Sequence, residues 1–264
     1  MRRENADVAT GLLDGKRLLI TGVARTDSIA FAVAERAQLH GAEVALAVFP
    51  RDLGGIEEVV SQLPSTPALV TPVDATLPED LAALDERLRS LWGHLDGALH
   101  AIAFAPSVAL QGILDVPSSA VELALRTSTH SYAALGRLVA DLAPTTGASL
   151  VGLDFDSSRA WPVYNWMGPC KAALRSLNQY LARDLGAGGV RANLVSAGPL
   201  RTRAAGAIPD FDVLLEAWER RAPLEWDPGD PAPVADAVCF LFSDLARAIT
   251  GEILYVDGGA HAIQ

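Results

Sequence analysis

The feature that most constrains this chain is a regular alternation of short apolar runs with longer stretches of helical spacing. The apolar runs are typical of strands buried on both faces, and they fall at residues 17–21, 43–48, 68–71, 97–102, 149–153, 191–195 and 253–256. The helical stretches lie between them, at residues 28–40, 77–92, 119–142, 161–185 and 233–243. This alternation predicts an α/β fold, a doubly wound parallel sheet of about seven strands with helices on both faces. Ligands of such sheets bind beyond the carboxyl ends of the strands.

Composition limits the classes of protein that remain. Half of the 264 residues are apolar and a fifth are charged, which argues against a disordered chain. There is no internal repeat or linker, so we expect a flexible tail at residues 1–10 and one domain at residues 11–264. The net charge of −11 disfavours a nucleic-acid partner or an anionic membrane surface. An acidic carrier protein could still dock on a local basic area.

No sequence signal points to a metal, a disulfide framework or a membrane. Cys170 and Cys239 are isolated from one another, and the five histidines lack metal-ligand spacing. The N-terminus has no apolar stretch typical of a signal peptide, and no apolar run approaches the length of a membrane span. We therefore expect a cytoplasmic protein without a bound metal.

Tyr164 and Lys171 are the strongest candidates for chemistry. On the predicted helix 161–185, seven residues make almost two turns, so both side chains would lie on one face. A phenol beside an ammonium suits a reaction in which negative charge develops on a substrate oxygen, and the lysine charge would favour polarisation of the phenol. Taken alone, this spacing is more often that of an amphipathic surface helix.

Three further segments change that balance. Residues 18–30 read as a strand, a glycine turn and a helix start, residues 193–202 read Asn-Leu-Val-Ser-Ala-Gly-Pro-Leu-Arg-Thr, and residues 255–259 read Tyr-Val-Asp-Gly-Gly. Over residues 11–261 the chain resembles the short-chain dehydrogenase/reductase superfamily. Within it, the chain resembles the NADH-dependent enoyl-(acyl-carrier-protein) reductases, above all the mycobacterial ones. The resemblance implies a single-domain Rossmann-type fold, NADH as cofactor, an enoyl thioester substrate and a homotetramer.

The resemblance assigns the cofactor to segments that follow the strands. The positions implied are Gly22, Ser28, Ile29, Phe49, Asp74, Ala75, Ala101, Ile102, Ala103, Lys171, Gly198, Pro199, Leu200 and Thr202. A helix that begins at Ser28 offers free amides and a positive dipole end to a pyrophosphate, and the serine can either cap the helix or contact phosphate. Small side chains at Ala101 and Ala103 permit a close approach to the nicotinamide ribose. The backbone of residues 198–200 would face the carboxamide, with Thr202 available to the pyrophosphate.

The end of the second strand bears on the choice between NADH and NADPH. The acid that usually follows this strand and binds the ribose 2′-hydroxyl is missing. The resemblance places Phe49 against the adenosine, whereas Arg51 could accept the 2′-phosphate of NADPH. Asp74 and Ala75 are implied to contact the adenine, although an aspartate that only initiates a turn is also plausible. NADH remains favoured over NADPH.

The spacing around Tyr164 favours reduction of a carbon–carbon double bond. Carbonyl reductases of the resembled superfamily carry a serine well before the tyrosine and a lysine one turn after it. Here apolar residues occupy the serine's place, and Gly168 stands four residues after Tyr164. Phe155 lies nine residues before Tyr164, as in the enoyl reductases. A shift of the lysine by three helical residues is about 4.5 Å of rise, enough to move the phenol relative to the ribose.

The resemblance also implies a role for each residue of the reaction centre. Tyr164 would stabilise the enolate oxygen, and Lys171 would hold the nicotinamide ribose. Phe155 and Met167 would line the acyl channel, as would Trp161, for which an ordinary core role is as plausible. Whether Tyr164 or water gives the final proton stays open.

Residues 204–226 are implied to form a substrate-covering loop and helix, shorter than in the mycobacterial relatives. Less apolar cover predicts a preference for shorter acyl chains. Two other interpretations stay open. One is a carbonyl-reducing enzyme of secondary metabolism, disfavoured by the missing serine, and the other is a catalytically silent nucleotide-binding sensor, disfavoured by Tyr164 and Lys171. The carrier, acyl carrier protein or coenzyme A, is undecided, as is a role in fatty-acid or specialised biosynthesis.

Overall fold

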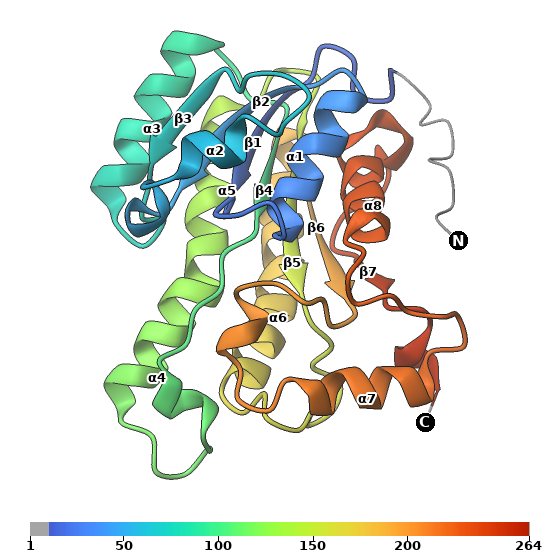
Figure 1. The fold of residues 1–264 in the computed structure, drawn as a ribbon. Coiled ribbons are helices and arrows are strands. Elements are labelled where there is room, and N and C mark those ends of the chain that lie inside the picture. Colours follow the sequence, from blue (N-terminus) through green and yellow to red (C-terminus); the bar gives the residue numbers. More distant parts are fainter. Residues whose placement is uncertain (1–10, 264) are drawn as a thin grey trace.

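The computed structural model describes residues 11–263, and the predicted tail at residues 1–10 lies outside the described residues. Seven strands form one sheet in the order β3-β2-β1-β4-β5-β6-β7, and all neighbours are parallel (Figure 1). The strands are β1 (Arg17–Thr21), β2 (Glu43–Val48), β3 (Leu69–Pro72), β4 (Gly97–His100), β5 (Ala148–Asp154), β6 (Val190–Ala197) and β7 (Ile253–Val256). The predicted doubly wound parallel sheet is confirmed.

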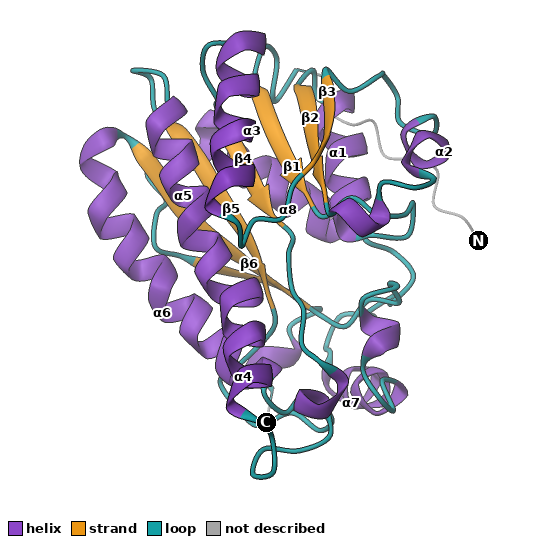
Figure 2. Ribbon diagram, turned by 90° about the vertical axis from the view of Figure 1, so that its left-hand side faces the viewer, coloured by secondary structure: helices purple, strands orange, loops and turns teal. Residues whose placement is uncertain are grey.

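Helices cover both faces of the sheet. They are α1 (Ile29–Leu39), α2 (Ile56–Val60), α3 (Pro78–Leu91), α4 (Ser118–Leu125), α5 (Ser131–Leu142), α6 (Met167–Leu185), α7 (Asp212–Arg221) and α8 (Ala232–Phe242). Helices α3, α5 and α6 lie on one face, and α1 and α8 lie side by side on the other (Figure 2). Each layer buries its own apolar cluster against the sheet. A third cluster lies beyond the carboxyl ends of the strands, where α7 crosses them (Figure 1).

One predicted strand and one predicted helix differ from the structure here, and one short helix was not predicted. The predicted strand 97–102 ends at His100, because the next amide, that of Ala101, donates to the Thr21 hydroxyl at 3.1 Å instead of continuing the ladder. The predicted helix 119–142 is interrupted by a π-helical segment, Arg126–His130. The short helix α2 was not predicted.

The π-helical segment turns two hydroxyls toward the reaction centre. The Ser128 hydroxyl bonds the backbone of Phe104, and the Thr129 hydroxyl donates to the carbonyl of Cys170 at 2.9 Å. A π segment of this kind inserts one residue into a helix and is frequent at functional sites. It fastens the helix α4–α5 to α6 next to Lys171.

The strand order reverses between β1 and β4, which is where doubly wound sheets open a crevice for ligands. Gly22 follows β1 with φ of 82°, and a Cβ there would collide with the carbonyl oxygen of Ala101. Only glycine fits this position without strain. The two strand ends therefore approach one another closely at the expected cofactor crevice.

Candidate active site

Tyr164 lies in a turn before α6, not on the helix. The predicted helix 161–185 begins only at Met167, so the expectation that Tyr164 and Lys171 share a helix face is wrong. The physical reason is local. Pro162 disfavours helical backbone at the residue before it, and Val163 and Asn165 have φ of 58° and 40°, which no helix accommodates.

The turn is held by the segment that follows β4. The Asn165 side chain donates to the carbonyl of Leu110 at 2.7 Å, and the Trp166 amide donates to the carbonyl of Ala109 at 3.2 Å. A β-branched residue with positive φ, such as Val163, is a true outlier. Such strain persists only where the surroundings impose it, and it is common at active sites. The turn thus sets the direction of the Tyr164 side chain.

The phenol of Tyr164 lies in an aromatic cluster of Phe155, Trp161, Tyr164 and Trp218. The Phe155 ring is central, because its centroid lies 4.7 Å from Tyr164, 6.0 Å from Trp161 and 5.3 Å from Trp218. All four side chains are buried, and Met167 packs with them. Among the described residues the Tyr164 hydroxyl has no hydrogen-bond partner, so it is free to donate to a ligand.

Burial, and not the neighbouring lysine, dominates the electrostatics of Tyr164. Burial raises the pKa of Tyr164 above its ordinary value, and the Asp154 carboxylate and Cys170 raise it further. Lys171 is not among the groups that shift it. The free protein thus shows a raised and not a lowered pKa for the phenol, and its polarisation by the lysine charge stays a prediction. The phenol keeps its proton and remains a hydrogen-bond donor.

Lys171 lies on the first turns of α6 with its side chain buried. Its ammonium donates to the carbonyl of Leu153 at 2.8 Å, at the end of β5. Burial lowers the pKa of Lys171, while the Asp154 carboxylate opposes that shift. One of the three N–H donors of the ammonium is thus bonded to the backbone. The remaining donors can serve a ribose.

A buried ionic network behind the site escaped prediction. Asp154 and Asp156 flank Phe155, and the guanidinium of Arg175 lies 2.7 Å from the first carboxylate and 3.4 Å from the second. Arg175 also donates to the Tyr255 hydroxyl at 2.8 Å. The sequence did contain a sign of this network, because Arg175 comes one helical turn after Lys171 and so lies on the same face of α6. This network positions the loop that carries Phe155.

The helix start at Ser28 is capped by its own hydroxyl. Ser28 accepts from the Phe31 amide at 3.1 Å and donates to the Arg25 carbonyl at 2.8 Å. Of the two roles left open for this serine, capping is the one that its contacts support. Ile29 opens α1, and the first amides of a helix have no partner within the helix.

The residues expected at the adenosine end are partly engaged with one another. The Phe49 ring is 43% exposed, and the Arg51 guanidinium lies 5.4 Å from its centroid. Asp74 accepts from both the amide and the hydroxyl of Thr76, at 2.9 and 2.7 Å, which is the turn role considered for it. Ala75 is buried beside it. Contact with an adenine remains a prediction.

The expected nicotinamide end combines the exits of β4 and β6. Ala101, Ile102 and Ala103 follow β4 outside any helix or strand, and none of them is buried. Beyond β6, the three residues Gly198, Pro199 and Leu200 bond within the protein. The Gly198 amide donates to Val256 at 2.9 Å, the Pro199 carbonyl accepts from Trp226 at 2.9 Å, and the Leu200 carbonyl accepts from Thr202 at 2.9 Å. Their contact with a carboxamide stays a prediction.

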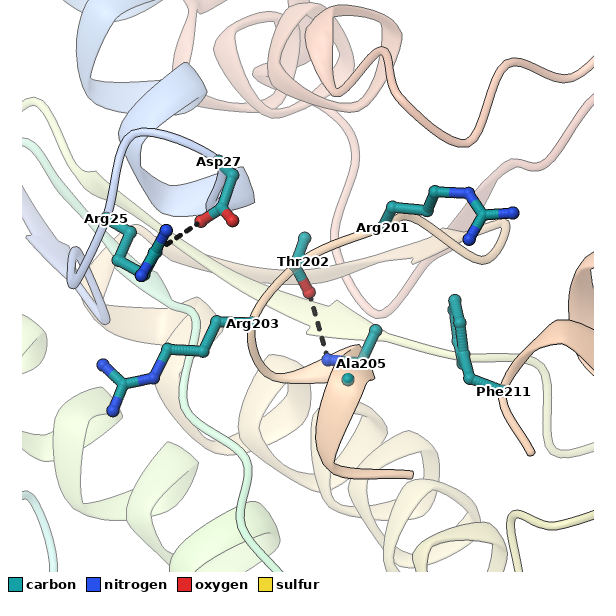
Figure 3. Close-up of a pocket in the computed structure, with 8 residues that line it drawn as sticks. Arg25, Asp27, Arg201, Thr202, Arg203, Ala205 and Phe211 are labelled. Atoms are coloured by element: carbon teal, nitrogen blue, oxygen red, sulfur yellow. Dashed lines mark hydrogen bonds and ion pairs between the residues drawn. The ribbon is translucent and has the colours of Figure 1, made fainter. Parts of the chain in front are cut away.

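A basic cavity of about 390 Å³ opens between the first loop and the segment after β6 (Figure 3). It is lined by Arg25, Asp27, Arg201, Thr202, Arg203, Ala205, Gly206 and Phe211. The Thr202 hydroxyl accepts from the Ala205 amide, and Arg201 and Arg203 extend to opposite sides of Thr202 (Figure 3). Three guanidiniums near a helix N-terminus suit a phosphate-bearing ligand.

The segment 204–226 contains a 3₁₀ turn, Ala205–Ala207, and α7. Its buried side chains are Leu214, which packs on the aromatic cluster, and Trp218, which is a member of that cluster. The rings of Trp218 and Trp161 pack at a tilt of 36° with their centroids 4.6 Å apart, and the indole nitrogen of Trp161 has no hydrogen-bond partner within residues 11–263. Trp218 also leaves no room for a side chain at Gly198, just after β6, because a Cβ there would lie 2.8 Å from the indole nitrogen of Trp218.

Several sequence expectations concern absences. Both cysteines are buried and free. Within the described residues no group of His, Cys, Asp or Glu side chains could hold a metal ion, and no helix has the length and apolarity needed to cross a membrane.

Comparison with known proteins adds independent findings. A family model described as enoyl-(acyl carrier protein) reductase matches residues 22–261. A protein of Mycolicibacterium smegmatis named enoyl-(acyl-carrier-protein) reductase (NADH) is 41% identical over 266 residues, which cover 95% of this chain and 98% of that protein. The enzyme of the same name from Mycobacterium avium is 42% identical, over 95% of this chain and 97% of its own. One from Aquifex aeolicus is 38% identical, over 95% and 93%.

Proposed function

Because the chain belongs to the enoyl-(acyl-carrier-protein) reductase family, we propose that it reduces the trans-2 double bond of an enoyl thioester with NADH, in fatty-acid-type biosynthesis. The observation that carries this proposal is the unpartnered hydroxyl of Tyr164 inside an apolar aromatic cluster, at the carboxyl end of the sheet. It offers one hydrogen-bond donor beside a surface suited to an acyl chain.

Tyr164 acts on the developing charge. NADH, when bound, supplies the hydride that adds to the β-carbon of the substrate. As negative charge collects on the thioester oxygen, the Tyr164 hydroxyl donates a hydrogen bond to it. Burial keeps this phenol protonated, so the donor is present before the charge develops. The surrounding rings of Phe155, Trp161 and Trp218 exclude water, which strengthens that bond.

Lys171 and the crevice bind the cofactor. Lys171, which the Leu153 carbonyl holds in place, would hold the nicotinamide ribose when NADH is bound, so its role is mainly positioning. The fit of a dinucleotide is supported by the glycine-dependent approach of the first loop to β4 and by the N-terminus of α1. The basic cavity beside Thr202 supports the placement of a pyrophosphate there.

The aromatic cluster sets the acyl chain length. Trp161 packs edge-on against Phe155 and Trp218 packs at a tilt against it, close to Tyr164, so an extended acyl chain meets large rings a short way from the thioester. We expect gains in catalytic efficiency to level off at medium-length chains. The short segment 204–226 acts as the cover and contributes Trp218 to this wall.

The carrier and the assembly complete the proposal. The thioester is carried by acyl carrier protein, with coenzyme A esters as substitutes in the assay. The enzyme is a cytoplasmic homotetramer whose long helices α5 and α6 pair across two-fold axes. In support, Tyr180 is 55% exposed on α6. Light scattering at micromolar concentration tests this, and a monomeric mass would rule it out.

The decisive assay is consumption of NADH against trans-2-enoyl and 3-oxoacyl thioesters, each on coenzyme A and on acyl carrier protein. The proposal expects oxidation of NADH with the enoyl thioesters only. Oxidation with the 3-oxoacyl thioesters alone would favour the carbonyl-reducing alternative. No turnover with any substrate, while NADH still binds, would favour the silent sensor.

A further inference from the structure

A largely covered carboxylate lies between two exposed guanidiniums after the end of β2. Asp52 closes the 3₁₀ turn Pro50–Asp52 that follows Phe49. Its Oδ1 atom lies 3.1 Å from Nη1 of Arg203 and 3.6 Å from Nε of Arg51. The Asp52 side chain is only 12% exposed, whereas those of Arg51 and Arg203 are 65% and 56% exposed. The carboxylate is therefore covered and both cations are accessible.

The ion pair between Asp52 and Arg203 spans the crevice. Arg203 belongs to the segment after β6, and three strands, β1, β4 and β5, separate β6 from β2 in the sheet. Arg203 also lines the basic cavity and extends away from Arg201 (Figure 3). The pair thus joins the adenosine side of the crevice to the pyrophosphate side, next to the exposed ring of Phe49.

This position is where dinucleotide folds distinguish NADH from NADPH. An acid after the second strand accepts a hydrogen bond from the ribose 2′-hydroxyl, whereas an arginine there pairs with a 2′-phosphate. Arg51 and Arg203 without Asp52 would form a two-arginine phosphate site. With Asp52 between them, a 2′-phosphate would meet a carboxylate, and like charges at this range disfavour one another.

We propose that Asp52 is the residue that makes this enzyme prefer NADH. It engages the guanidiniums of Arg51 and Arg203 and repels a 2′-phosphate. The hydrogen bond from Arg203 uses Oδ1, and among the described residues Oδ2 accepts no hydrogen bond, so Oδ2 is left to accept the ribose hydroxyl. Asp52 thus takes the role of the acid that was missing from its usual place in the sequence. The inference rests on the proposed function, since it assumes a reductase that takes a nicotinamide dinucleotide.

The test is Asp52→Asn, which removes the charge and keeps the shape. kcat/KM is measured for NADH and for NADPH with one enoyl thioester. The ratio of NADPH to NADH efficiency should rise at least about tenfold, the effect that one charge within about 4–6 Å has on an ionisation equilibrium. A double variant, Asp52→Asn with Arg203→Met, should lose most of that gain. Asp236→Asn is the matched control, because Asp236 on α8 also pairs with an arginine, Arg36 in the last turn of α1, at 2.8 Å.

Binding of 2′,5′-ADP and of 5′-ADP, measured by calorimetry, gives a readout that does not need turnover. Asp52→Asn should tighten 2′,5′-ADP and leave or weaken 5′-ADP. An unchanged nucleotide preference in a folded Asp52→Asn variant would overturn the proposal, as would a wild-type enzyme that uses both dinucleotides equally. If no enoyl thioester is reduced at all, the proposed function fails. The binding of 2′,5′-ADP and 5′-ADP to the wild type and to Asp52→Asn then still decides the role of Asp52.

Discussion

Replacing Tyr164 by phenylalanine separates catalysis from stability. The hydroxyl has no hydrogen-bond partner in the described part of the chain, so its removal breaks no bond of the free protein. The Phe155 contact at 4.7 Å involves the ring, which the variant keeps. Deleting an unpaired polar group is close to neutral for folding. We therefore expect a shift in Tm of less than about 2 °C.

The loss in turnover should be large. A single donor to a developing oxyanion contributes about 10²–10³ in kcat, or roughly 2.7–4 kcal/mol. The Kd for NADH should stay within about twofold, because Tyr164 acts mainly when charge develops. Steady-state kinetics gives kcat, and quenching of intrinsic fluorescence gives the Kd. Turnover within about tenfold of wild type, in a folded variant, would refute the oxyanion role.

Tyr132 provides the matched control. Its side chain is fully buried on the α5 side of the sheet, and its hydroxyl donates to Asn178 at 2.9 Å and to the Asn193 carbonyl at 3.2 Å. Tyr132→Phe should lose about 1–3 kcal/mol of stability, because two buried acceptors lose a donor, while turnover per folded molecule persists. A second check uses pH. Because burial raises the pKa of Tyr164, the phenol should stay protonated and cause no loss of activity between pH 6 and about 9. If wild-type activity falls over this range and the residual activity of Tyr164→Phe does not, the raised pKa is contradicted.

Three other perturbations test neighbouring parts of the site. Lys171→Met should raise the Kd for NADH far more than it lowers kcat. Because burial lowers the pKa of Lys171, the wild-type lysine should lose its charge below the ordinary lysine pKa of about 10.4. NADH binding to the wild type, followed by calorimetry, should therefore weaken as the pH rises toward that value. Trp161→Leu should free space for about three methylenes at roughly 0.8 kcal/mol each, so kcat/KM for long chains should rise by up to about fiftyfold in a four-to-sixteen-carbon series; no change would remove Trp161 from the acyl wall. Gly22→Ala should abolish NADH binding and lower Tm, because its Cβ meets the Ala101 carbonyl, whereas Gly15→Ala, with φ of 72° and open space, should cost only backbone strain.

The sequence by itself determined the sheet and much of the crevice. Strands buried on both faces must be apolar throughout, so their runs are visible without knowledge of their neighbours. The strand ends at β1, β2 and β7 agree with the predicted boundaries. The turn at Gly22 and the helix cap at Ser28 could also be predicted from the sequence, because a positive φ and a helix cap depend on the local backbone alone. The family resemblance, confirmed by the matched relatives, rests on the same local segments.

Only the tertiary structure decided how the reaction centre is arranged. Helical spacing around Tyr164 suggested one face shared with Lys171, but the contacts of the turn with residues 109–113 hold Tyr164 off the helix. The pKa of the phenol follows from burial by residues distant in the chain, which no local pattern encodes. The pairing of Asp52 with Arg203 joins positions 151 residues apart. Such a contact depends on where the sheet places the two loops, and a single sequence does not show which distant loops come together.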